Sequence, residues 1–159
     1  MKSIATEAPV LVIGYGNILR DDDGVGWAAA RRLARRLPRR LASVLMVHQL
    51  LPELAEPISR ATRAIFIDAD ERLAPGQVRQ KTVQPPDRAD ETIGHHQSPG
   101  GLLRLARDLY GRAPEALLFS IGAADFDFRP TLSTQVRRAL PGLLQSVADA
   151  VRDVERCHA

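Results

Sequence analysis

Acidic and imidazole side chains occur at three places where a loop meets an expected strand or helix. The first is the acidic turn Asp21-Asp22-Asp23, the second is Asp68 at the end of an apolar run, and the third is the pair His95-His96. Carboxylates combined with imidazole suit a borderline divalent metal such as nickel, zinc, manganese or iron. The sequence contains no His-Glu-x-x-His segment and no cysteine pair, so the ligands of such a site must converge through the fold.

The elements that position these residues alternate between apolar strands and amphipathic helices, which predicts a doubly wound α/β sheet. Segment 77–84 alternates in polarity, which favours a partly exposed strand at the sheet edge. Ser98 with Pro99 predicts a helix start, Gly111 its end, and Ser133 the start of a last helix. We expect strands at residues 10–13, 43–48, 64–70, 77–84 and 116–122, and helices at 27–37, 52–58, 99–109 and 133–154.

The strand order decides whether the acidic groups meet. With order 2-1-3, the carboxyl ends of the first and third strands are neighbours, so Asp23 and Asp68 project into one crevice that the histidine loop can close. Structural roles compete with this interpretation. Asp21 and Asp22 serve at least as well as caps of the following helix, and for Asp68 capping and chemistry are evenly matched. The histidines could be ordinary loop residues.

A glycine pattern at the first strand offers a different function, dinucleotide binding. Gly14-x-Gly16 begins the G-x-G-x-x-G motif, but Leu19 stands where the third glycine belongs. The three carboxylates that follow would repel a pyrophosphate at the helix N-terminus. The sequence therefore argues against dinucleotide binding.

Composition limits the remaining function classes. The 159 residues, 45% of them hydrophobic, predict one globular domain over residues 1–159. No apolar run approaches the ~20 residues that span a bilayer, no signal peptide is visible, and Cys157 is a single cysteine. We therefore expect a cytoplasmic protein without a membrane partner. The arginine-rich segment 31–40 predicts a solvated helix face rather than a nucleic-acid surface, because only 4% of residues are aromatic.

Four segments, in this order along nearly the whole chain, resemble the motifs of the nickel-iron hydrogenase maturation endopeptidases. The resemblance implies a three-layer αβα sandwich around a mostly parallel five-stranded sheet with one antiparallel edge strand. It also implies an endopeptidase that removes the C-terminal extension of a nickel-iron hydrogenase large-subunit precursor after nickel insertion. The segments are Gly14–Gly26, Gln49–Ala55, Phe66–Ala69 and His95–Pro99, the last followed by Leu102-Leu103.

The metal-contacting triad of that family, carried over by motif, falls on Asp23, Asp68 and His96, with His95 as the alternative to His96. The resemblance implies that the metal is the substrate's own nickel, so we expect no resident cofactor. The partner is the large-subunit precursor, which a monomer would meet transiently. Neither Cys157 beside the terminus nor Ser120 inside a strand is a convincing nucleophile.

Contacts with the substrate are expected at Gly16, Asn17 and Glu53, although Asn17 could instead hold its loop. The chain departs from some relatives in two ways. Asp23 replaces a glutamate, and residues 48–53 replace a glycine-rich turn after the second strand. If that turn contacts the substrate, the cognate hydrogenase belongs to a different group.

Two other functions fit the same residues. One is a metallohydrolase that holds its own divalent metal and acts on small substrates. The other is a nickel-gated assembly chaperone that binds the loaded precursor without cutting it. Metal content and cleavage distinguish them from the maturation protease.

Overall fold

A computed structural model describes residues 8–88, 97–124 and 131–157 of the chain, and its strands form one sheet. Three pairs of neighbouring strands are parallel, whereas the edge strand Val78–Val83 runs antiparallel to the strand Glu115–Gly122. The expected 2-1-3 order and the exposed antiparallel edge are thus confirmed. The order is β2-β1-β3-β5-β4, with β1 Val10–Tyr15, β2 Ala42–Val47, β3 Arg63–Asp70, β4 Val78–Val83 and β5 Glu115–Gly122.

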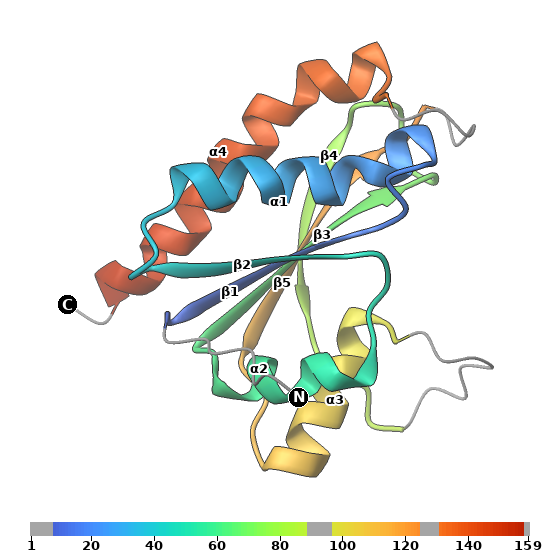
Figure 1. The fold of residues 1–159 in the computed structure, drawn as a ribbon. Helices are drawn as coiled ribbons and strands as arrows, with labels where there is room; N and C mark the ends of the chain where they lie inside the picture. Colours follow the sequence, from blue (N-terminus) through green and yellow to red (C-terminus); the bar gives the residue numbers. More distant parts are fainter. Residues whose placement is uncertain (1–7, 89–96, 125–130, 158–159) are drawn as a thin grey trace.

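Helices cover both faces of this sheet, which gives the expected three-layer α/β sandwich (Figure 1). Because strand side chains alternate, Val10 and Val12 face one core while Leu11 and Ile13 face the other. One face carries α1 (Val25–Arg36) and α4 (Thr134–Cys157), and the other carries α2 (Ala55–Arg60) and α3 (Pro99–Tyr110). Short 3-10 turns at Asp21–Gly24 and Pro52–Leu54 precede α1 and α2.

Helix ends follow the sequence signals. The Ser98 hydroxyl accepts a hydrogen bond from the Gly101 amide at 3.0 Å, and Gly111 ends α3 with a φ of 76°. Ser133 accepts a longer bond, 3.4 Å, from the Val136 amide at the start of α4. This helix continues to Cys157 rather than Val154; Val154 is its last residue in the core, and the three residues that follow are exposed.

We expect Ser98→Ala to lower the free energy of unfolding by about 1 kcal/mol, since the Gly101 amide loses its acceptor. Urea denaturation measures the change. Ser98→Asn is the matched control, because asparagine is an equally good N-cap and should keep most of the stability. Equal losses in both variants would contradict a capping role.

The first strand runs further than expected, because Gly14 is paired with both Met46 and Ile67. Glycine allows α1 to lie directly on this strand end. A Cβ at Gly14 would lie 2.0 Å from the Gly26 carbonyl oxygen, and a Cβ at Gly26 would lie 2.3 Å from that of Tyr15. This close packing holds the acidic turn beside the ends of β1 and β3.

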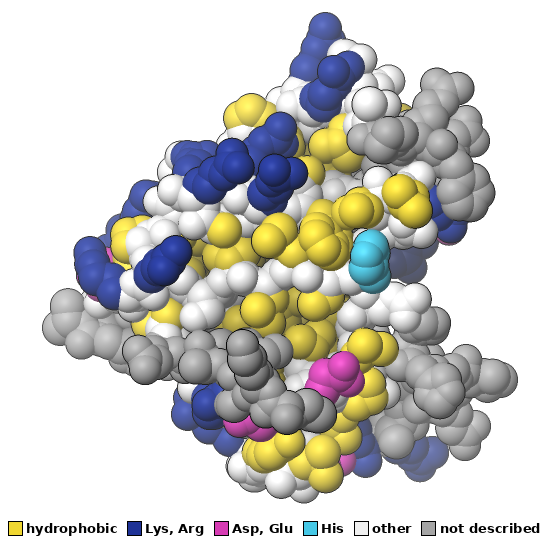
Figure 2. All heavy atoms as spheres, in the orientation of Figure 1, with side chains coloured by type: hydrophobic (Ala, Val, Ile, Leu, Met, Phe, Trp, Pro, Cys, Tyr) yellow, Lys and Arg dark blue, Asp and Glu magenta, His cyan; other side chains and the backbone are white. Residues whose placement is uncertain are grey.

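The basic face of α1 is solvated, as the sequence predicted. Its arginines are exposed, whereas Leu33 and Leu37 are buried. Figure 2 shows Lys and Arg side chains gathered over α1, above an apolar band along the free edge of β2. None of the helices in the described residues is long and apolar enough to cross a membrane.

Candidate active site

A row of side chains crosses the sheet near the carboxyl ends of its parallel strands. The Tyr15 hydroxyl of β1 donates a hydrogen bond to Asp68 of β3, and strand register places Asp68 next to Ser120 of β5 and Ser120 next to Arg79 of β4. Tyr15 packs against the core beneath α2 and α3, so the row continues that face of the sheet. In open α/β sheets this end of the strands is where ligands bind.

Asp68 is the most perturbed carboxyl group of the site. Burial raises its pKa from 3.8 to about 6, against the opposing effects of hydrogen bonds from the Tyr15 hydroxyl and the Ala69 amide. The charges of Asp23 and Asp70 raise it further. Burial and the Asp68 charge also raise the pKa of Tyr15, so the phenol stays protonated and donates to Asp68.

Asp70, two residues further along β3, has the opposite environment. The exposed Arg72 donates to Asp70 from its backbone amide at 2.9 Å and from Nε at 3.1 Å. These hydrogen bonds lower the pKa of Asp70. Asp70 is therefore ionised and paired, whereas Asp68 keeps a carboxylate that no cation pairs within the described part of the chain.

Asp23 is fixed by the loop that precedes it. Its Oδ2 accepts a hydrogen bond from the Asn17 amide at 2.9 Å, and Asn17 Oδ1 accepts one from Leu19 at the same distance. Gly16 has a φ of 136°, and a Cβ there would lie 2.0 Å from the Asp23 carbonyl oxygen. Since the Asp23 charge raises the pKa of Asp68, the structure brings these two predicted site residues close together.

Asp22 is a structural anchor rather than a cap of the following helix, so that expectation is wrong. Its side chain is fully buried and accepts bonds from the amides of Ala124 and Ser133, both at 2.7 Å. The Ser133 hydroxyl donates a further bond of 2.8 Å. The helix α1 begins at Val25, and no side chain caps it at its N-cap residue Gly24. Asp22 thus ties the acidic turn to the chain after β5.

The remaining predicted residues are only partly placed. His95 and His96 lie outside the described residues, and within the described ones no three acidic, histidine or cysteine side chains form a metal-binding group. Asn17 holds its loop, one of its two expected roles. Glu53 is exposed in a separate pocket of ≈ 420 Å³ beside Trp27 and Met46. Substrate contact by Gly16, Asn17 and Glu53 stays a prediction.

Known proteins share this arrangement of strands and helices. No family model matches the chain. A putative hydrogenase maturation protease of Methanocaldococcus jannaschii is 24% identical over 152 residues, which is 90% of this chain and 96% of that protein. The solved structure of the hydrogenase maturating endopeptidase HybD from E. coli superposes with a TM-score of 0.74 at 22% identity. The alignment covers 91% of this chain and 93% of HybD.

The chain has the fold of the hydrogenase maturation proteases. HybD from Thermococcus kodakarensis, a [NiFe] hydrogenase maturation protease, superposes with a TM-score of 0.67 at 26% identity. The alignment covers 89% of this chain and 98% of that HybD chain. The resemblance predicted from the four motifs is thereby confirmed. These maturation proteases are hydrolases, the enzyme class that the sequence predicted.

Sequence reasoning missed Tyr15, Ser120 and Arg79. Tyr15 stood between two glycines, and Ser120 was considered only as a nucleophile. Strand register places Ser120 and Arg79 in one row with Asp68, and a hydrogen bond joins Tyr15 to the same row, so four neighbouring strands contribute. The alternating polarity along the edge strand gave a clue to Arg79, because successive side chains of a strand point to opposite faces of the sheet.

Proposed function

We propose that this protein is an endopeptidase that removes the C-terminal extension of a nickel-iron hydrogenase large-subunit precursor after nickel insertion. The observation that carries the proposal is the approach of Asp23, on the turn before α1, to Asp68 of β3, in a chain with the fold of the maturation proteases. The sequence resemblance adds His96, or His95, as the third group. The nickel belongs to the substrate, and the protein needs no resident cofactor.

The two carboxylates suit this role chemically. Carboxylate oxygens combined with imidazole are suitable ligands for nickel. Asp23 has one oxygen, Oδ1, that accepts no hydrogen bond within the described residues, because the Asn17 amide bonds Oδ2. Asp68 is held by Tyr15 and ionises near neutral pH. Contact with nickel in the precursor would fix the position of the scissile bond, and such positioning lowers a reaction barrier by several kcal/mol.

A processing assay by mass spectrometry tests the proposal. The purified protein is mixed with the large-subunit precursor, with and without nickel, and the mass of the precursor is followed. We expect loss of a C-terminal peptide from the nickel-loaded precursor only. Tight binding without cleavage would replace the proposal with the assembly chaperone. Stoichiometric metal in the purified protein, with activity on small substrates, would replace it with the metallohydrolase.

The pH dependence of processing provides a second measurement. Contact with nickel requires the Asp68 carboxylate, so kcat/KM is expected to fall about tenfold for each pH unit below its pKa of about 6. Tyr15→Phe removes a hydrogen bond that lowers this pKa, so the acid limb should move to higher pH. Tyr110→Phe, at an exposed tyrosine, is the control. If the acid limb of the pH profile does not move in Tyr15→Phe, a group other than Asp68 causes it.

A further inference from the structure

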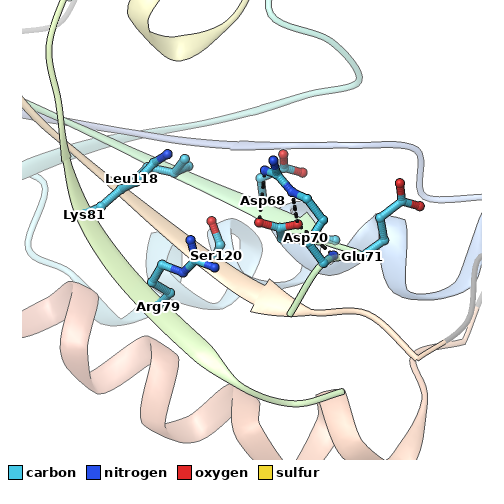
Figure 3. Close-up of a pocket in the computed structure, with 9 residues that line it drawn as sticks. Asp68, Asp70, Glu71, Arg79, Lys81, Leu118 and Ser120 are labelled. Carbon is cyan, nitrogen blue, oxygen red and sulfur yellow. Dashed lines mark hydrogen bonds and ion pairs between the residues drawn. The ribbon is translucent and has the colours of Figure 1, made fainter. Parts of the chain in front are cut away.

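The pocket of ≈ 440 Å³ beside Asp68 has two walls of opposite charge. One wall carries Asp68 and Asp70 of β3 and Glu71 of the turn that follows. The other carries Arg79 and Lys81 of β4, across the pocket (Figure 3). Arg72 is engaged by Asp70 on the acidic wall. The basic wall plays no part in the metal contact proposed above.

Arg79 and Lys81 lie at alternate positions of an edge strand, so they share one face. Both side chains are exposed, and neither makes an ion pair within the described part of the chain. Lys81 is paired with Leu118 and Arg79 with Ser120 in the strand register. The two cations thus lie side by side on the edge strand and have unused donors.

Ser120 lies between the two walls. It is only 6% exposed, lines the pocket, and its hydroxyl makes no hydrogen bond within the described residues. A buried polar group without a partner costs about 1–3 kcal/mol, and most such groups in folded proteins have one. The hydroxyl is therefore available to donate to a ligand atom that sits between Asp68 and Arg79.

We propose that Arg79, Lys81 and Ser120 form a subsite for a carboxylate of the peptide substrate. The inference rests on the proposed endopeptidase function. Guanidinium, ammonium and hydroxyl groups together supply donors that match a carboxylate, and arginine binds it in a bidentate manner. Repulsion from Asp68 keeps this carboxylate on the β4 side. The substrate chain is thereby oriented with its anionic group toward β4 and the bond to be cut toward β3.

The carboxylate has two possible sources in a peptide, an acidic side chain and the chain terminus. Three peptides separate them: acetyl-Ala-Ala-Ala-Glu-amide, acetyl-Ala-Ala-Ala-Ala with a free carboxylate, and the same peptide as an amide. Each is titrated into the isotope-labelled full chain, and the backbone amide signals of residues 79–81 and 120 are followed by NMR. We expect saturable shifts with one or both carboxylate peptides and none with the neutral amide. Equal shifts with all three peptides, or none with any, would overturn the proposal.

Variants locate the binding. The double variant Arg79→Gln/Lys81→Gln should weaken carboxylate binding by about tenfold, in line with hydrogen bonds to charged groups. Ser120→Ala should weaken it by less. Arg138→Gln is the matched control, because this exposed arginine lies on α4 across the sheet. Similar affinities for the double variant and the control would overturn the assignment.

These titrations do not depend on proteolysis, so the two proposals fail separately. A precursor that is processed normally by the double variant, together with unchanged peptide binding, rejects the subsite and leaves the endopeptidase function intact. Carboxylate binding in a protein that never cleaves the precursor rejects the proteolysis and retains the subsite. Support for both requires a raised KM for the precursor in the double variant, with kcat nearly unchanged.

Discussion

Asp68→Asn is expected to lower processing of a nickel-loaded precursor by at least about a hundredfold, equivalent to about 2.7 kcal/mol of barrier. Asparagine has nearly the same shape as aspartate, and its amide oxygen can accept the hydrogen bond from the Tyr15 hydroxyl. It lacks the negative charge that makes a carboxylate a strong ligand for a divalent metal. Asp23→Asn should have a comparable effect, while its amide oxygen keeps the bond to the Asn17 amide. Rates of peptide release measure both losses.

The stability of Asp68→Asn shows whether the variant loses activity through its chemistry or through its structure. The pKa of Asp68 in the folded state, about 6, exceeds its ordinary value of 3.8. The folded chain therefore binds more protons at Asp68 than the unfolded chain between these pH values, and stability falls as pH rises. Asp68→Asn removes this cost, so the variant should be more stable than the parent at pH 7. The advantage should shrink as pH falls toward 4.

Urea denaturation at pH 7 and pH 4.5 measures this difference. Asp70→Asn is the control, because the pKa of Asp70 is lowered and its replacement should bring no gain. An Asp68→Asn variant that processes the precursor at the parental rate would remove Asp68 from the site. A variant that loses both activity and stability at pH 7 would give Asp68 a structural role instead.

The largest loss of stability is expected from Asp22→Ala, about 3 kcal/mol. The substitution removes the acceptor for the Ala124 amide and for the amide and hydroxyl of Ser133. Buried donors left without a partner cost about 1–3 kcal/mol each, and water that enters the space recovers part of this. Thermal or urea unfolding measures the loss. Hydrogen exchange at the amides of Ala124 and Ser133 should accelerate.

The control for this variant is Asp153→Ala. Asp153 is an exposed acid of α4 that pairs with Arg156 at the surface, and such pairs contribute little. The loss of stability in Asp22→Asn should lie between those of the two variants. Asparagine keeps one acceptor oxygen, but its NH₂ group faces a donor that the carboxylate now binds. An Asp22→Ala variant as stable as Asp153→Ala would show that the buried carboxylate is not an anchor.

The contrast between Asp22 and Asp23 marks a limit of sequence reasoning. Both are aspartates of one acidic turn, and the sequence predicted the site role of Asp23 but not that Asp22 is a buried anchor. The turn is a 3-10 helix, in which successive side chains point about 120° apart. Asp22 consequently points toward Ser133, whereas Asp23 lies near Asp68. The conformation of this turn therefore determines which aspartate is the anchor and which lies in the site.

Local sequence patterns correctly predicted the strands and the ends of helices. Apolar runs located the strands, and Ser98 and Gly111 marked the ends of α3. The convergence of Asp23 and Asp68 followed from strand order alone. The row from Tyr15 to Arg79 could not be predicted in this way, because the pairing of β5 with both β3 and β4 is a tertiary property. The pairing of the strands brings these side chains together, and the composition of the sequence does not reveal that pairing.

The strand order has a consequence for synthesis of the chain. The edge strand β4 pairs with β5, although β5 follows it in the sequence after the whole of α3. On the ribosome, β4 therefore emerges before the strand that joins it to the sheet. The wall that carries Arg79 and Lys81 is assembled only when Glu115–Gly122 has left the exit tunnel. A nascent chain shorter than this has Asp23 and Asp68 but an incomplete pocket, so the complete site forms late in translation.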